Sequence, residues 1–122
     1  MYYIASPYTD PDPAVREKRY QEVTNLIATL IHDVPGPYFS PISYFHPIAV
    51  KYNLPVTFDW WLQVNLGFLA SATKLVVFMG DGWQSSNGVM HEIGYATING
   101  LPIEYQPGFE NPAIDGKALW PR

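Results

Sequence analysis

The stretch KLVVFMGDGWQSSNGVMHEIGYATINGLPIEY (residues 74–105) decides the fold, because it reads as a strand, a helix and a second strand in succession. Its first six residues are nearly all apolar, which is typical of a strand buried on both faces. After a loop with glycines and serines, a helix predicted over residues 87–98 ends at Asn99-Gly100, a left-handed cap signal. A strand over residues 101–105 follows. This unit predicts parallel strands joined by a right-handed crossover.

The chain upstream shows the same alternation. We expect a strand over residues 2–5, a helix over 14–32, a strand over 38–42 that Pro41 shortens, a loop through His46, and a helix over 58–72 capped by Thr57. Alternating strands and helices with short links predict an α/β fold in which helices cover both faces of a parallel sheet. The fold class is therefore a flavodoxin/Rossmann-like three-layer sandwich with strand order 2-1-3-4.

Composition limits the size of the protein and the kind of partner it binds. The chain has 122 residues, 48% of them apolar and 16% aromatic, so we expect one domain over residues 1–122. The net charge of -4 argues against polymeric nucleic acid or a membrane and favours a small molecule. There is no cysteine for a disulfide or a thiolate site. The N-terminus MYYIASPY has neither a basic region nor a long apolar run, so we expect a cytoplasmic location.

The strand order also predicts where a ligand binds. Strands 2–5 and 74–79 are neighbours at the point where the winding of the sheet reverses. The loops that follow them, SPY at residues 6–8 and GDGWQSSNG at residues 80–88, therefore open into one crevice. Ser6 begins the first of these loops and is a candidate for substrate binding.

The helix start after the second loop carries the residues best suited to chemistry. Ser85, Ser86 and the free amides beside them can hold an anionic group such as a nucleotide 5′-phosphate, helped by the helix dipole. Gly88 leaves its face of the helix bare, and Glu92 lies four residues later on the same face. A carboxylate placed against an anomeric carbon can displace a nucleobase and hold the sugar covalently.

Four fragments spread over roughly residues 2–105 form a wider pattern. They are IASPY after the first strand, Arg16 with Arg19-Tyr20 in the first helix, FSPISYFHPIA after the second strand, and GW-x-S-x-x-G-x-x-x-E-x-x-x-A near the end. Together they resemble the nucleoside 2-deoxyribosyltransferase superfamily, and within it a short phage and bacterial branch of unknown function. The superfamily contains transferases, nucleoside and nucleotide hydrolases, and uncharacterised members.

The resemblance implies roles for individual residues. Glu92 corresponds to the nucleophile, Tyr8 lies beside it and orients it, and Ser85 with Gly88 lies at the sugar or phosphate end of the substrate. The aromatic residues expected at the surface and the small sheet domain predict a homo-oligomer, a homodimer or homotetramer. A neighbouring subunit can then complete the site, as it does in the proteins that this chain resembles.

Two positions depart from the pattern of the superfamily. Its transferases usually carry an acid on the helix before the third strand, where this chain has Asn65, and an Asp ahead of that strand, where this chain has Ala72-Thr73. Protonation or recognition of the leaving base must then fall to another group, for which Asp59 and Asp81 are candidates, or the reaction differs.

Three further side chains are candidates for substrate binding, each with a structural alternative. Trp83 either stacks on a base or packs in the core. Arg19 either reaches a phosphate or pairs with neighbouring acids. His46, in the loop expected after the second strand, is a candidate for contact with a base or a sugar. Asp81, which lies between two glycines, either contacts the substrate or only forms the turn.

No metal and no cofactor are expected. His32, His46 and His91 lie in separate segments without the spacing of metal ligands. On the predicted helix, His91 also points about 100° away from Glu92.

We therefore expect an enzyme that cleaves the N-glycosidic bond of a (deoxy)nucleoside or its 5′-monophosphate through Glu92. Hydrolysis is favoured over deoxyribosyl transfer, because so short a chain leaves little room for a pocket specific for a second base. Two alternatives remain open. One is a catalytically silent nucleotide-binding protein, in which Asn65 marks lost chemistry, and the other is a glycohydrolase acting on NAD or a related nucleotide.

Overall fold

The computed structural model describes residues 1–108, which form a four-stranded parallel sheet in the order β2-β1-β3-β4. The strands are β1 (Tyr2–Ala5), β2 (Tyr38–Phe39), β3 (Lys74–Met79) and β4 (Ile103–Pro107). The helices are α1 (Pro13–Asp33), α2 (Pro41–Tyr52), α3 (Phe58–Ala70) and α4 (Asn87–Asn99), and a 3₁₀ turn, η1 (Trp83–Ser85), precedes α4. The predicted fold class, strand order and parallel pairing are confirmed.

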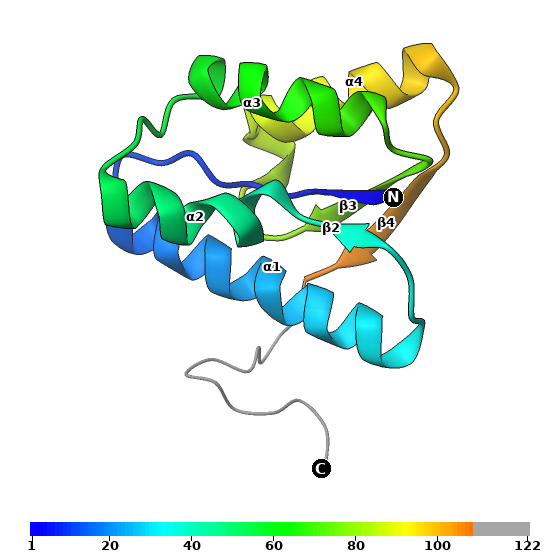
Figure 1. The fold of residues 1–122 in the computed structure, drawn as a ribbon, viewed down its shortest axis with the longest axis horizontal. Coiled ribbons are helices and arrows are strands. Elements are labelled where there is room, and N and C mark those ends of the chain that lie inside the picture. Colours follow the sequence, from blue (N-terminus) through cyan, green and yellow to red (C-terminus); the bar gives the residue numbers. More distant parts are fainter. Residues whose placement is uncertain (109–122) are drawn as a thin grey trace.

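The sheet forms the middle of three layers (Figure 1). Successive side chains of a strand point to opposite faces, and the buried residues of β1 and β3 follow this period. One face packs on α3 and α4; it carries Tyr3, Ala5, Leu75 and Val77. The other face packs on α1; it carries Ile4, Val76 and Phe78. Because β1 and β3 are covered on both sides, they read in the sequence as continuous apolar runs.

Helix α2 is the main difference from the sequence prediction. We expected a strand up to Ile42 and then a loop through His46, but β2 ends at Phe39 and a helix begins at Pro41. The reason is capping: the Ser40 hydroxyl oxygen accepts a hydrogen bond of 3.0 Å from a first-turn amide, and proline at the first helical position has no amide to leave unpaired. His46 therefore lies on a helix.

The other helices begin and end largely as their capping residues predict. The Asp12 carboxylate caps α1 through a 2.9 Å bond from the Ala14 amide, and Ser86 caps α4. Gly100 ends α4 in the left-handed conformation, as expected. The prediction for Thr57 is wrong in one respect: it occupies the N-cap position of α3 but makes no side-chain cap hydrogen bond.

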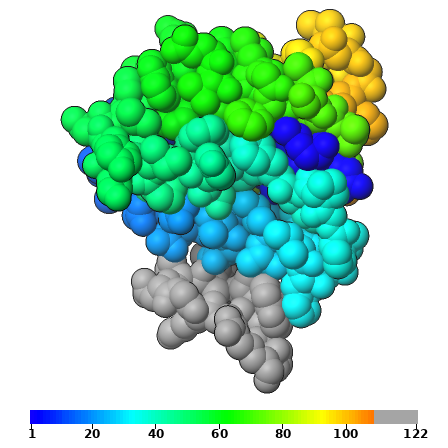
Figure 2. Space-filling view, viewed as in Figure 1, coloured from blue at the N-terminus to red at the C-terminus, as the bar shows by residue number. Residues whose placement is uncertain are grey.

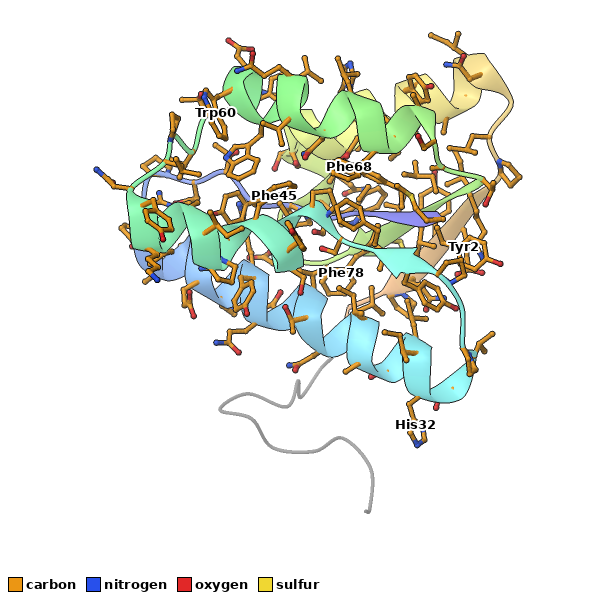
Figure 3. The ribbon with its side chains drawn as sticks, viewed as in Figure 1. Tyr2, His32, Phe45, Trp60, Phe68 and Phe78 are labelled. Carbon is orange, nitrogen blue, oxygen red and sulfur yellow. The ribbon has the colours of Figure 1, made fainter. Side chains whose placement is uncertain are left out.

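Aromatic contacts join α2 to α3, which lie side by side on one face of the molecule (Figure 2). The ring of Phe45 on α2 lies 5.5 Å from that of Trp61 and 6.1 Å from that of Phe68, both on α3. Phe45 and Phe68 fill the space between the two helices (Figure 3). These ring contacts hold α2 and α3 together.

Residues 1–108 build one sheet with its covering helices, in keeping with a single domain, while residues 109–122 of the predicted domain lie outside the described part of the chain. Across the described residues, every helix is too short or too polar to traverse a lipid bilayer.

Candidate functional site

A cavity lies at the carboxyl ends of β1 and β3, bounded by α3 and by the start of α4. Seven of the candidate residues from the sequence line it: Ser6, Tyr8, Asn65, Ser85, Ser86, Gly88 and Glu92. Because β1 and β3 are neighbours with the winding reversing between them, the two loops that follow these strands meet here, as the strand order predicted.

Glu92 stands in the wall of this cavity, one turn after Gly88 on α4, and both residues face it as the spacing predicted. Burial raises the pKa of the Glu92 carboxyl to about 8, and the Tyr3 hydroxyl partly offsets this effect. The carboxyl is therefore neutral in part of the molecules at neutral pH, and a ligand that brings positive charge or hydrogen-bond donors favours its ionised form.

The resemblance implied that Tyr8 orients Glu92, and the structure assigns the two tyrosines differently. Tyr3 of β1 is the tyrosine that interacts with Glu92: burial raises the pKa of its phenol, and the Glu92 carboxylate raises it further. The Tyr8 hydroxyl instead hydrogen-bonds Nδ1 of His46 at 2.7 Å. Tyr8 still lines the cavity, but its hydroxyl is hydrogen-bonded to His46 of α2.

The cavity gathers polar atoms that lack partners. Among the described residues, six buried side-chain nitrogen or oxygen atoms have no hydrogen-bond partner, and five of them belong to residues of the cavity wall: Tyr3, Ser6, Trp61, Asn65 and His91. An unpaired buried polar group costs about 1–3 kcal/mol, so such groups are rare unless a ligand or water satisfies them. Their concentration at one cavity makes it the candidate binding site for a polar molecule.

The start of α4 presents the anion-binding features expected from the sequence. Ser85, Ser86, Asn87 and Gly88 all line the cavity, and the Ser86 hydroxyl accepts a 3.3 Å hydrogen bond from the Val89 amide. The Ser85 hydroxyl bonds the Gly82 carbonyl at 3.1 Å and is exposed. A Cβ built on Gly88 would meet only ordinary contacts, the nearest at 3.8 Å, so the bare surface at this residue is available to a ligand.

His46 does not contact the cavity, contrary to the expectation that it touches a base or sugar. It is 3% exposed on α2, stacks on the Tyr20 ring at 4.6 Å, and bonds Tyr8 through Nδ1 and Glu17 through Nε2. The helical register of α2, which the sequence analysis missed, turns this side chain inward toward α1.

Four other candidates also lie outside the cavity wall. Asp59 and Asp81 are exposed, so neither stands where it could protonate a base in the cavity. Trp83 packs against the core and lies edge-on to Tyr105 at 6.1 Å. Arg19 donates hydrogen bonds to the carbonyls of Tyr8 and Thr9 and packs against the backbone of the β3–α4 loop, so it shapes the site without lining it.

Sequence reasoning missed three residues of the cavity wall that carry unpaired polar atoms, Tyr3, Trp61 and His91, and it missed Glu17, which bonds His46 outside the wall. His91 was set aside because it points away from Glu92 around the helix, yet the cavity is wide enough for both to line it. Tyr3 could have been found from strand alternation, since it shares a face of β1 with Ala5, toward α4. Glu17 has no sequence signal, because only the unpredicted helix α2 brings His46 to it.

Within residues 1–108, no three His, Cys, Asp or Glu side chains converge in a way that could hold a metal ion.

The fold is that of a flavodoxin/Rossmann-like α/β protein, and its polar cavity lies at the point where the winding of the sheet reverses. Residues 1–106 match the family described as a domain of unknown function, DUF1937, and the chain belongs to this family. No curated protein matches the chain.

Proposed function

We propose that this protein cleaves the N-glycosidic bond of a nucleoside or a nucleoside 5′-monophosphate, with Glu92 as the nucleophile. The observation that carries the proposal is the position of this carboxyl. It stands in a cavity wall where five residues each have a buried polar atom without a hydrogen-bond partner, and it lies one helical turn from a bare glycine at the start of a helix suited to bind an anion.

The chemistry expected of Glu92 follows from its surroundings. An oxocarbenium-like transition state develops positive charge at the anomeric carbon, and an ionised carboxylate in a poorly solvated site stabilises that charge strongly. A Glu92 oxygen then forms the bond to the anomeric carbon as the bond to the base breaks. The same burial raises the pKa of Glu92 to about 8, so the ionised form is the reactive minority at neutral pH.

The walls suit the three parts of a nucleotide. Ser85, Ser86 and the free amides that start α4 suit a 5′-phosphate. Trp61 and Phe58 on α3 offer aromatic surface to a base, and Asn65 offers an amide that can hydrogen-bond it. Ser6, directly after β1, and Tyr3, within it, both line the cavity and can contact sugar hydroxyls.

Hydrolysis is the reaction proposed first, with deoxyribosyl transfer to a second base as the variant. Both share the covalent step on Glu92 and differ only in whether water or a base takes the sugar. Hydrolysis and transfer can be distinguished with the wild-type protein. When free bases are added to the reaction, only a transferase converts them into new nucleosides or nucleotides.

The test is base release from a panel of ribo- and deoxyribonucleosides, their 5′-monophosphates and NAD, followed by chromatography with and without free bases. We expect release by the wild type, a loss of about 10³-fold or more in Glu92→Gln, and no change in Glu22→Gln. Glu22 is a matched control, since it pairs with Lys18 on α1, away from the cavity. Binding without release from any member would support a silent nucleotide-binding protein instead.

A further inference from the structure

Three side chains from separate parts of the chain form a hydrogen-bonded series that starts at the cavity. The Tyr8 hydroxyl, after β1, lies 2.7 Å from His46 Nδ1 on α2, and His46 Nε2 lies 2.5 Å from a Glu17 carboxylate oxygen on α1. His46 is 3% exposed, whereas half of the Glu17 side chain faces solvent. The series therefore runs from the cavity wall through the core to the surface.

The proton positions in this series follow from the donors and acceptors. Glu17 is ionised, since the hydrogen bond from His46 lowers the pKa of its carboxyl, so it can only accept and Nε2 must carry a proton. Nδ1 then either accepts from Tyr8, when His46 is neutral, or donates to Tyr8, when His46 is an imidazolium. In the second case the Tyr8 proton is free to turn toward the cavity, because among the described residues only His46 hydrogen-bonds this hydroxyl.

His46 also contacts α1. Its Nε2 is hydrogen-bonded to the Glu17 carboxylate, and its ring stacks on the Tyr20 ring at 4.6 Å. Arg16 acts on Tyr8 from α1 and opposes the effect of Glu17 there. Burial raises the pKa of the Tyr8 phenol, so Tyr8 does not release a proton without receiving another in exchange.

The proposed reaction needs such a donor. A departing nucleobase must be protonated, and Asn65 stands where an acid would serve but has no proton of that kind to give. Asp59 and Asp81 lie outside the cavity wall, and Glu92 must be ionised to attack.

We propose that Tyr8 delivers the proton to the leaving base and that His46 and Glu17 are positioning residues that recharge it. This inference rests on the proposed glycosidase function. As the N-glycosidic bond breaks, its electron pair goes to the base nitrogen, which takes the Tyr8 proton. The Tyr8 oxygen takes the Nδ1 proton of the imidazolium, which leaves His46 neutral, with its Nε2 proton still hydrogen-bonded to Glu17. In the second step the oxygen of a water molecule bonds to the anomeric carbon as the bond to Glu92 breaks. The proton that this water loses goes to the Tyr8 oxygen, whose own proton returns to Nδ1 and restores the imidazolium.

The test compares 2′-deoxyguanosine 5′-monophosphate with its N7-methyl derivative. Methylation places a positive charge on the purine, so that base leaves without a proton. For Tyr8→Phe we expect kcat on the unmethylated substrate to fall about 10²-fold or more and kcat on the methylated substrate to change less than about threefold. Glu17→Gln, a substitution at the surface, should show the same selectivity to a smaller degree. Tyr44→Phe, which removes an exposed hydroxyl on α2, should change neither substrate.

A second measurement does not need turnover. In ¹⁵N NMR of the free protein, Tyr8→Phe should shift the His46 Nδ1 resonance and Tyr44→Phe should not. Equal losses of kcat on both substrates in Tyr8→Phe, or an unchanged Nδ1 resonance, would overturn the relay while leaving the glycosidase proposal in place. Absence of turnover by the wild type on these two nucleotides and on every member of the panel above would remove the glycosidase proposal and, with it, the role of the relay.

Discussion

The Tyr3 hydroxyl on β1 and the Glu92 carboxyl on α4 share the wall of one cavity and change each other's affinity for protons. Burial raises the pKa of both groups; the Glu92 carboxylate raises that of Tyr3 further, while the Tyr3 hydroxyl lowers that of Glu92. The Tyr3 hydroxyl makes no hydrogen bond of normal length and angle. A small movement that brings it into such a bond with Glu92 would favour the ionised carboxylate.

The pH dependence of catalysis tests the state of Glu92. Because the pKa of this carboxyl is about 8 and the nucleophile must be ionised, we expect kcat/KM to rise about tenfold per pH unit up to about pH 8 and then level off. An N7-methylated purine substrate is the right probe, since its base needs no proton from the protein. A rate that is flat or falls between about pH 6 and about pH 8 would mean that Glu92 acts in its neutral form.

The same carboxyl should lower the stability of the folded protein at neutral pH. Its pKa rises from 4.5 to about 8 on folding, so below the lower value it is neutral in both states and costs nothing. Stability is then lost as pH rises toward the higher value, because the unfolded chain releases its proton first. We expect Glu92→Gln to raise the free energy of unfolding by about 3 kcal/mol at pH 7.

Denaturant unfolding at two pH values checks this linkage. The gain in Glu92→Gln should vanish at about pH 4, where both residues are neutral. Equal gains at both pH values would show that packing, and not ionisation, separates the two variants.

Two glycines on α4 separate ligand contact from helix stability. A Cβ at Gly88 would stand in the cavity wall without a clash, and a Cβ at Gly94 would meet nothing within 4 Å. Both alanine variants should fold, and Gly94→Ala in the helix interior should gain up to about 1 kcal/mol. Only Gly88→Ala should raise KM, by about 3- to 30-fold, since it fills the surface on which the substrate rests. Equal KM values in both variants would place the substrate elsewhere.

The two serines before α4 should differ in what they contribute. Ser86 caps the helix, so Ser86→Ala should cost about 1 kcal/mol of stability. The Ser85 hydroxyl is exposed at the cavity and bonds only a nearby carbonyl, so Ser85→Ala should leave stability unchanged. It should reduce the preference for a 5′-monophosphate over the nucleoside by about three- to tenfold, measured as the ratio of kcat/KM values. An unchanged ratio would remove Ser85 from the phosphate site.

The sequence predicts the fold well where apolar periods are long. KLVVFM at Lys74–Met79 is buried on both faces as predicted, and the order of the strands follows from the alternation of elements. Helix α2 was missed because Pro41 was interpreted as the end of a strand. A proline directly after a serine is also a cap followed by a first helical residue, and only the tertiary context selects between the two.

The part of the site that lies on a single helix, α4, could be predicted from the sequence. The spacing of Gly88 and Glu92 on a single helix placed both in the cavity. Asp59 was predicted to contact the base but does not line the cavity. Phe58 and Leu62 of α3 line it, and Asp59 lies about 100° around the helix from Phe58. The contact between His46 and Glu17 joins two helices and depends on packing that no local pattern encodes.

Covalent trapping on Glu92 tests the central claim most directly. The reagent is a 2′-fluoro deoxynucleoside with an N7-methylated purine, because fluorine slows both steps and the good leaving group restores the first. Intact-protein mass spectrometry should show a gain equal to one fluorosugar, and peptide sequencing should place it on Glu92. Release of the base without any adduct, or an adduct on another residue, would contradict Glu92 as the nucleophile.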